Sequence, residues 1–316
     1  MSGSVTRQAD VAEFERIFAE VSNWGRWGPD DQLGTLNYLT PDMVVAAAGL
    51  VRSGRHVSMS LPINTVAGPD NPNPALHHVI QGHDVDIGSA GVRFGFDFLG
   101  IAFHGDCHTH MDAMCHLSWQ GQTYNGKSAL EVLTTRGGTS LDVDAYSTGL
   151  VGRGVLFDIP RFRGVEWLEP GDAVTRAELE AYEAAMDVEV REGDIFVFRT
   201  GHHRRRLALG PWDNSAAGEG KAGLHVDTIA WMHDRRISAF LPDGDGETVP
   251  GSVDGIAYPI HPLQLVAMGM LTADSLQLED IARACEDEGR LEFMVIGLPL
   301  RIVGGTGSPW NPIAVF

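Results

Sequence analysis

The sequence predicts an α/β fold, a single domain built on a mixed β-sheet. In the second half of the 316-residue chain, apolar runs of buried-strand length alternate with amphipathic helical segments, while the first half is richer in strand patterns. Gly and Pro (38 and 16 residues) are scattered along the chain instead of gathering in a linker, and we see no internal repeat. We therefore expect one domain over residues 1–316.

Local signals mark the boundaries of the first elements. Thr40 and Pro41 stand where a helix N-cap and a first helical residue belong, and the apolar residues after them predict a helix that runs to Val51. The alternating stretch "HVSMSLPI" (56–63) then predicts a strand.

The second half supplies the repeated strand and helix pattern. "GVLFDI" (154–159) and "GDIFVFRTG" (193–201) are apolar runs of buried-strand length. Between them, Thr175 and Glu178 form a capping box that opens an amphipathic helix. Helices are then expected in "LHVDTIAWMHDRR" (224–236), "PLQLVAMGM" (262–270) and "DSLQLEDIARACEDEG" (274–289), and strands in "ISAFLPDG" (237–244) and "EFMVIGLPLRI" (292–302).

Composition narrows the class of protein. The net charge of -19 argues against nucleic acid or an anionic membrane as partner, because both need a basic surface. The N-terminal stretch has no apolar core of the signal-peptide kind, and no run approaches the ~18 apolar residues that span a bilayer. Three cysteines are too few for a disulfide framework, so we expect a cytoplasmic protein.

The densest chemical signal is "HGDCHTHMDAMCH" (104–116). If its first nine residues were extended, the even-numbered side chains would share one face. Imidazole and carboxylate groups together suit a divalent ion such as Zn²⁺ or Mn²⁺, and an open coordination position would activate water. A polar strand edge with satisfied histidines is the alternative, but the density of the cluster favours a metal. The even-numbered candidates are His104, Asp106, His108, His110 and Asp112, and His116 follows them.

Several known metal motifs match only part of this stretch. "HTHMDA" fits the first five positions of the metallo-β-lactamase signature H-x-H-x-D-H, but Ala113 stands where its last His must be. Cupins require a Glu where Met114 and Cys115 stand. Amidohydrolase barrels carry H-x-H on their first strand, and here it falls a third of the way along the chain. None of the three patterns explains the cluster.

A fourth pattern fits better. "THMDAMCH" (109–116) resembles the T-H-x-D-x-x-x-H core of the cyclase family that includes bacterial kynurenine formamidase and isatin hydrolase. The segment over residues 27–63 looks like the N-terminal part of the longer members, which suggests an N-terminal extension over residues 1–60 that packs on the domain. Other matches in the order of the family are "YNG" (124–126), "RGVLFDI" (153–159), "GDIFVFRTG" (193–201), "IHPLQLVAMGM" (260–270) and "GGTGSPWNPIAVF" (304–316).

The resemblance implies a metal centre in which each residue has a defined role. In this family one or two divalent ions, typically Zn²⁺ or Mn²⁺, are held by a His-x-x-x-His-x-Asp array. Metal-bound water attacks an amide, lactam or lactone carbonyl, and a nearby His shuttles the proton. By this match His110 and Asp112 are ligands and His116 is the catalytic base. Four residues before His110 stands Asp106 in place of His, so His104 and His108 are equal candidates for the missing ligand, with Asp106 behind them.

The resemblance also implies a distal His and an acidic residue. His261 matches the His, and we expect it to contact substrate. Asp274, thirteen residues on, stands where the family has Glu, and we expect it to take part in catalysis. A core histidine and a helix N-cap are the respective alternatives.

The expected activity is metal-dependent hydrolysis of an amide, cyclic amide or lactone bond in a small molecule. A metal-dependent cyclase or dehydratase of polyketide-like intermediates is the second enzymatic possibility, and a non-catalytic metal-binding protein is the third. By resemblance, the fold is the swivelling β/β/α arrangement of the family and the protein is a homodimer.

Other tempting residues are more simply explained by structure. Cys107 and Cys115 are expected to be buried thiols. "GHHRRR" (201–206) favours a solvated loop over a carboxylate-binding site, and His77 and His78 are expected in a loop bordering the pocket. Pocket walls or core are the alternatives for Trp24, Trp27 and Trp310.

Overall fold

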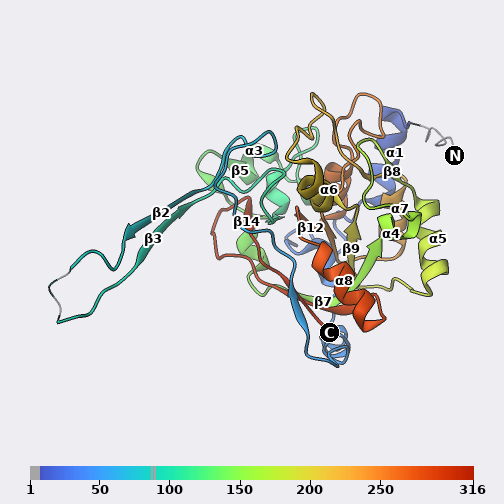
Figure 1. The fold of residues 1–316 in the computed structure, drawn as a ribbon. Coiled ribbons are helices and arrows are strands. Elements are labelled where there is room, and N and C mark those ends of the chain that lie inside the picture. The colour runs from blue at the N-terminus through green and yellow to red at the C-terminus, as the bar shows by residue number, and fades with distance from the viewer. Residues whose placement is uncertain (1–7, 87, 89) are drawn as a thin grey trace.

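The computed structural model describes residues 8–86, 88 and 90–316, and it is built around a nine-stranded mixed sheet (Figure 1). The central strands β7, β9, β11 and β12 are parallel, and the outer pairs are antiparallel. This confirms the predicted α/β class with a mixed sheet. The order across the sheet is β1 (His56–Ser58), β15 (Ile313–Val315), β13 (Glu292–Gly297), β7 (Leu150–Asp158), β9 (Ile195–Arg199), β11 (Ala239–Pro242), β12 (Leu271–Asp274), β4 (His110–Asp112) and β14 (Gly307–Pro309).

The parallel strands are mostly apolar because both faces of the sheet are covered. Strand alternation sends Phe196 and Phe198 of β9 into one hydrophobic core and Ile195 and Val197 into the other. Helices α1 (Val11–Val21), α5 (Arg176–Met186) and α7 (Thr228–Asp234) contribute buried side chains to the first core, and α8 (Glu279–Glu288) contributes to the second. The run "GDIFVFRTG" is thus a fully buried strand, as predicted.

Helix starts follow their local capping signals. The Thr40 side chain accepts from the Met43 N–H at the start of α2 (Pro41–Ala48), and Thr175 accepts from Glu178 N–H at the start of α5. Helix α8 begins at Glu279 with Leu278 at the N-cap, so the alternative that Asp274 caps this helix is wrong.

Three sequence predictions need correction. The stretch "PLQLVAMGM" forms a π-helix, η5 (Pro262–Met268), and the strand expected over 292–302 ends at Gly297. The "GHHRRR" stretch is not a loop: residues 202–206 begin helix α6 (His202–Leu209). That helix begins where the Asp243 carboxylate accepts the backbone N–H groups of Thr200, Gly201 and His202. Asp243 directly follows β11, so the sequence around the helix does not reveal this contact.

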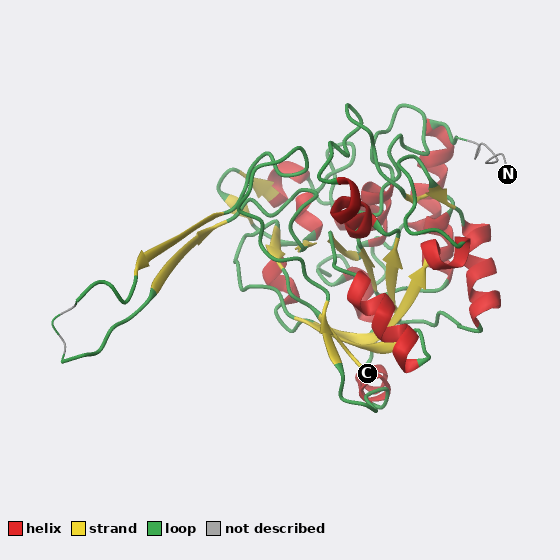
Figure 2. Cartoon of the chain, viewed as in Figure 1, coloured by secondary structure: helices red, strands yellow, loops and turns green. Residues whose placement is uncertain are grey.

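A long hairpin extends away from the rest of the molecule (Figures 1 and 2). Its strands are β2 (Leu76–Gln81) and β3 (Phe96–Gly100), and we call residues 76–86 and 90–100 the arm. His77 and His78 lie on β2, so the expectation of a loop bordering the pocket is wrong.

Short elements complete the described chain. The α-helices and strands among them are α3 (Ala129–Val132), α4 (Ile159–Arg163), β5 (Leu133–Thr134), β6 (Gly137–Gly138), β8 (Ala173–Val174) and β10 (Gly223–Leu224). The 3₁₀ turns are η1 (Gly34–Tyr38), η2 (Met114–His116), η3 (Tyr124–Gly126) and η4 (Val143–Tyr146). Of residues 1–60, those from Gln8 onward contribute α1, α2 and β1, and the Asn23 N–H donates to the Ala267 carbonyl of η5. Within the described residues, every helix is too short or too polar to cross a membrane.

Candidate metal centre

The pairing of two strands brings together side chains from distant parts of the sequence. His110 and Asp112 lie two residues apart on β4, so their side chains share one face. Strand β4 pairs antiparallel with β12 in a register that sets His110 opposite Asp274. As a result His110 Nε2 lies 3.5 Å from Asp112 Oδ1 and 3.6 Å from Asp274 Oδ2. All three side chains are buried.

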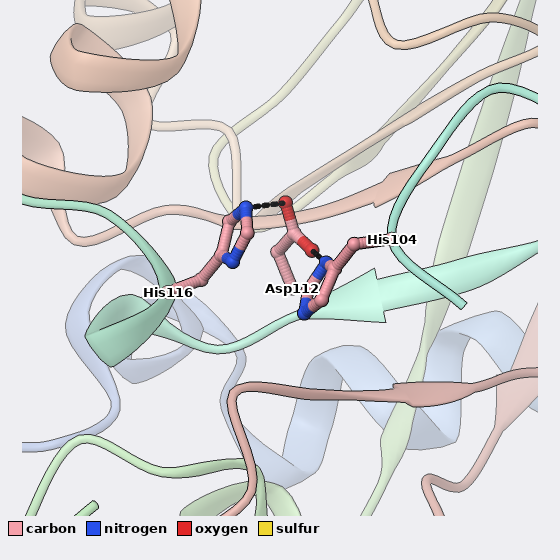
Figure 3. Close-up of side chains that lie close together, drawn as sticks. All are labelled: His104, Asp112 and His116. Atoms are coloured by element: carbon pink, nitrogen blue, oxygen red, sulfur yellow. Dashed lines mark ion pairs between the residues drawn. The ribbon is translucent and has the colours of Figure 1, made fainter. Parts of the chain in front are cut away.

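The segment before β4 is not extended, so the expectation that one strand carries residues 104–112 is wrong. The chain bends through residues 105–108, with Gly105 at φ +142°, and returns His104 to Asp112. His104 Nδ1 lies 3.0 Å from Asp112 Oδ1 (Figure 3). The His104 Nε2 atom lies 2.9 Å from Thr306 Oγ1. Of the three candidates for the missing ligand, His104 is the one placed against Asp112.

The other two candidates point elsewhere. His108 Nδ1 lies 3.5 Å from the backbone N–H of Asn64, and His108 falls in neither group of side chains that could share an ion. Asp106 Oδ1 accepts a 2.8 Å hydrogen bond from Lys221 Nζ. The structure therefore does not bring His108 or Asp106 to the carboxylate of Asp112.

His116 lies beside this cluster, on η2. Its ring stacks on that of His104 with centroids 3.8 Å apart and planes 10° apart. His116 Nε2 lies 4.0 Å from Asp112 Oδ2 (Figure 3). Burial lowers the pKa of His116, and the opposing charge of Asp112 does not overcome this effect. A neutral imidazole at neutral pH is the form that can accept a proton.

His261 closes the cluster from η5. Its Nε2 lies 3.6 Å from Asp274 Oδ2, and its Nδ1 lies 2.9 Å from Glu247 Oε1, which also accepts the His261 backbone N–H at 2.9 Å. Burial alone would lower the pKa of His261, but the contacts with Asp274 and Glu247 outweigh it and raise that pKa well above its ordinary value.

Two overlapping groups of side chains could each hold an ion. They are His104, Asp112 and His116, and His110, Asp112 and Asp274, so Asp112 belongs to both. Although burial favours the neutral acid, contact with His104 and the nearby His110 and His116 rings holds the pKa of Asp112 well below its ordinary range. Asp112 is therefore a buried anion at neutral pH.

Unpartnered polar atoms test whether a cation fits here. Asp274 Oδ1 is buried and makes no hydrogen bond within the described residues, and the buried atoms His104 Nδ1 and Asp112 Oδ1 face each other at 3.0 Å with no other hydrogen-bond partner there. Leaving such an atom unsatisfied costs ~1–3 kcal/mol. Each of these atoms carries a lone pair that can bind a metal, and a nitrogen and oxygen donor set suits Zn²⁺ or Mn²⁺. The residues present therefore fit a divalent ion.

The cluster forms one wall of a pocket of about 270 Å³. The pocket is also lined by Lys221, Asp245 and Tyr258, which the sequence did not single out. The Lys221 side chain is 4% exposed, and its Nζ donates to Asp106 Oδ1 at 2.8 Å and Asp245 Oδ2 at 2.5 Å. Burial alone would lower the pKa of Lys221, but the two carboxylates raise it. The pocket is small enough to suit a small molecule.

Some of the residues that line this pocket could have been predicted from the sequence. Asp245 and Glu247 follow β11, and Asp274 ends β12, so all three lie at the carboxyl ends of parallel strands, where ligands of open α/β sheets bind. The acidic stretch "DGDGET" (243–248) after a buried strand could have indicated them. Lys221, alone in "GEGKAG" (218–223), carries no such signal.

The remaining candidates are structural. Cys107 and Cys115 are buried free thiols, as predicted, and burial raises the pKa of each to about 12. Trp310 belongs to the second core, and Trp24 packs against it. The arginines of α6 form ion pairs within the chain: Arg204 with Glu166, Arg205 with Glu169 and Glu219, and Arg206 with Asp70.

Comparison with solved structures identifies relatives of this fold. A crystal structure described as a novel cyclase is 33% identical, covers 93% of this chain and 99% of its own, and superposes with a TM-score of 0.82. Isatin hydrolase A from Labrenzia aggregata, bound to benzyl benzoate, is 20% identical over 86% of this chain and 97% of its own, with a TM-score of 0.58. An isatin hydrolase bound to the product analogue thioisatinate is 19% identical over 87% and 98%, with a TM-score of 0.57.

Sequence comparison gives the family. No curated protein matches the chain. The family model Cyclase, described as "Putative cyclase", matches residues 55–245, more than half of the chain and the region that holds β4, η2, Lys221 and Asp245. This match and the 33% identical cyclase confirm the resemblance and the fold expected from it. The chain belongs to the cyclase family.

Proposed function

We propose that the chain is a metal-dependent hydrolase that opens an amide, cyclic amide or lactone bond in a small molecule. The observation that carries the proposal is the buried carboxylate of Asp112, which lies among three imidazoles at the wall of a pocket. A buried anion in such a position needs a cation to compensate it.

In this proposal His104, His110 and Asp112 hold Zn²⁺ or Mn²⁺, and Asp274 lies close enough to join them. When bound, such an ion polarises a carbonyl group and lowers the pKa of water. His104 takes the position that the sequence left open between His104, Asp106 and His108. Its contact with Thr306 Oγ1 fixes the ring orientation, as outer partners of metal-binding histidines commonly do.

His116 is the proton carrier in this arrangement. Stacking on His104 fixes the plane of its ring, and the lowered pKa keeps it neutral and able to accept a proton from water. It then returns the proton to the leaving amine or alkoxide. His261, which Glu247 and Asp274 hold in its protonated form, presents a cationic ring at the pocket wall and suits a substrate oxygen. Asp274 orients that ring.

The substrate class rests on chemistry shared with structural relatives. Isatin hydrolases have this fold, and isatin is a cyclic amide. Cyclic amides and imides therefore come first in a test panel, followed by formanilides and lactones.

The test combines metal analysis with turnover. We expect the purified protein to contain Zn²⁺ or Mn²⁺ and the double variant His110→Ala/Asp112→Ala to contain none. His116→Ala should keep the metal and lose activity by a factor of ~10²–10⁴, the usual contribution of a general base. His56→Ala, which changes an exposed histidine on β1, is the matched control and should behave as the wild type.

The other functions predict different results. Hydrolysis in water labelled with oxygen-18 places the label in the product, whereas a cyclase or dehydratase would convert its substrate without incorporating the label. Metal content without turnover on any substrate would indicate a binding protein. Full metal content in the His110→Ala/Asp112→Ala variant would disprove the site, and full turnover in His116→Ala would disprove the base.

A further inference from the structure

A second cavity adjoins the metal pocket. It has a volume of about 370 Å³ and is lined by residues 69–73, 104–108 and 213–215 and by Ala102, and we call it the side pocket. Residues 104–106 line both cavities. The two cavities therefore meet at the bend that precedes β4.

Two buried side chains of the side pocket each have a nitrogen without a partner. His108 is 4% exposed and Asn214 is 2% exposed. Within the described residues, His108 Nε2 and Asn214 Nδ2 make no hydrogen bond. Such atoms are rare in folded proteins because leaving a buried polar group unsatisfied is costly, so this pair calls for an explanation.

Both nitrogens are hydrogen-bond donors. The amide nitrogen of Asn214 carries two hydrogens and accepts none. The Asn64 backbone N–H donates to His108 Nδ1, with 3.5 Å between the two nitrogens, so the neutral ring carries its own hydrogen on Nε2. The side pocket therefore presents two N–H groups that lack an acceptor.

The charges around the side pocket disfavour an ionic ligand. Two of its carboxylates are already compensated, because Asp70 pairs with Arg206 and Asp106 accepts from Lys221. The third, Asp213, is exposed to solvent. Among the described residues, no lysine or arginine lines the side pocket itself, so an anion would meet carboxylates without a cation beside it. A cation would meet the two N–H groups, which repel it. A neutral oxygen avoids both conflicts.

We propose that the side pocket binds a neutral carbonyl oxygen of the substrate, remote from the bond that is hydrolysed, and that Asn214 and His108 donate to it. This inference rests on the function proposed above, since the same substrate extends from the metal pocket past the bend. It narrows the substrate class to small amides and lactones that carry a further ketone or amide group. Sites that donate hydrogen bonds reject analogues without the acceptor, because the donors then stay unpaired. Asn214 and His108 thus determine specificity and take no part in the bond cleavage.

The first experiment tests the side pocket without turnover. The probe is N,N-dimethylacetamide, a neutral molecule with a carbonyl oxygen and no N–H group, which is titrated into protein labelled with nitrogen-15. We expect the side-chain amide signal of Asn214, assigned by its loss in Asn214→Asp, to shift and to saturate in the millimolar range. The signal of Asn311, an exposed residue outside the side pocket, is the control and should not shift.

Two ions and one variant test the chemistry of the ligand. Acetate and tetramethylammonium replace the probe as an anion and a cation, and neither should shift the Asn214 signal. His108→Phe keeps a ring but removes the Nε2 donor, so it should weaken binding of the probe ~2–10-fold, the usual value of one hydrogen bond. Tighter binding of either ion would overturn the assignment to a neutral acceptor. No shift with any of the three probes would disprove the side pocket as a binding site.

The second experiment tests the link to turnover. Isatins with an acetyl group at ring position 5 or 6 are compared with isopropyl isatins, which have a similar shape but no oxygen in the substituent. We expect one acetyl isomer to have a KM ~10-fold below that of its isopropyl counterpart. Asn214→Ala should raise this KM ~10-fold and leave kcat unchanged, because a contact remote from the reacting bond stabilises the bound substrate and the transition state equally. Asn73→Ala, which changes an exposed asparagine of the same pocket, is the matched control and should keep the preference.

The outcomes separate the side pocket from the hydrolytic function. If the isatins are hydrolysed without any difference between acetyl and isopropyl compounds, the side pocket has no role in substrate binding and the hydrolase stands. If no isatin is hydrolysed but N,N-dimethylacetamide shifts the Asn214 signal, the side pocket stands and isatins are not the substrates. An acetyl preference that survives Asn214→Ala, or that Asn73→Ala removes equally, would overturn the role of Asn214.

Discussion

Asp112 and Lys221 are two buried charges that line the same pocket and differ in their partners. Asp112 is an anion among imidazoles, whereas Lys221 is a cation with two carboxylate partners. The negative charge of Asp112 therefore leaves room for a bound cation, whereas two carboxylates of the chain compensate the positive charge of Lys221. Because Asp106 binds Lys221, the bend that carries His104 is attached to the segment that carries Asp245. We therefore assign Lys221 a structural role, not a role in binding anions.

We expect Lys221→Met to destabilise the protein by ~3 kcal/mol, because removing one partner of a buried ion pair leaves the other charge uncompensated. The free energy of unfolding in urea measures this loss. Adding Asp106→Asn and Asp245→Asn should recover most of it, since the two carboxylates then no longer repel each other. Lys127→Met, a partly exposed lysine on a 3₁₀ turn boundary, is the control. No recovery in the triple variant would contradict the ion-pair explanation.

At the scale of elements, the cluster joins segments that backbone pairing and a few side-chain hydrogen bonds also hold together. His104 comes from a bend, His110 and Asp112 from β4, and Asp274 from the end of β12. Thr109 adds one direct tie, because its Oγ1 accepts from the Leu61 N–H at 2.8 Å and donates to the Ser275 carbonyl at 2.6 Å. An ion bound by these residues would connect the same elements more strongly.

Metal removal should therefore lower stability as well as activity. A ligand that binds only the folded state at 100 times its Kd stabilises it by about 2.7 kcal/mol, which corresponds to roughly 5 °C in Tm for a chain of this size. We expect EDTA to lower Tm by about this amount and added Zn²⁺ or Mn²⁺ to restore it. Asp112→Asn should not respond to either treatment. Equal responses of the variant and the wild type would contradict binding at Asp112.

Elements with local signals were predictable from the sequence, and elements that depend on distant contacts were not. The caps at Thr40 and Thr175 act within three residues, and both helices begin where expected. Helix α6 was missed because its cap, Asp243, comes from the turn after β11, about 40 residues later in the chain. The nearly continuous apolar runs of the parallel strands predicted the centre of the sheet, because strands that are buried on both faces have few polar residues.

The residues of the candidate site also divide into those that the sequence predicted and those whose place depends on distant contacts. His110, Asp112 and His116 lie within seven residues of sequence, and the motif indicated all three. The choice between His104 and His108 depends on the bend at Gly105 and on Thr306 and Lys221, which are far away in the chain. Spacing could not decide it, because the assumption of an extended segment was wrong. Lys221 forms its ion pairs only when the fold brings together Asp106 in the bend and Asp245 after β11.

At the scale of the whole molecule, buried ionisable groups set how stability depends on pH. Burial lowers the pKa of His202 to about 4, so the unfolded chain binds a proton below its ordinary value of 6.5 and the folded chain does not. Stability from this group is therefore lost as the pH falls from 6.5 towards 4. Burial raises the pKa of Asp194 and of Asp243 to about 6, so these groups act in the opposite direction.

His202→Phe should make the protein relatively more stable at acid pH. The ring of His202 packs on Trp212 with centroids 4.6 Å apart, and Phe keeps a ring there but cannot be protonated. Between pH 7.5 and pH 5 the wild type should lose about 2 kcal/mol more than the variant, from the linkage between pKa and stability. Urea unfolding at both values, with EDTA present, measures the difference. His56→Phe should leave the pH dependence of the wild type unchanged.

The sheet also pairs strands that lie far apart in the sequence. Strand β1 lies against β15, with His56 opposite Val315, and the Phe316 N–H donates to the Arg55 carbonyl. During synthesis on the ribosome, β1 cannot take its place in the sheet until its neighbour β15, which begins only at Ile313, has been made. The parallel strands β7, β9 and β11 can assemble earlier, since their contacts are nearer in sequence. During synthesis, β1 therefore remains unpaired, and open to pairing with other chains, for longer than the parallel strands do.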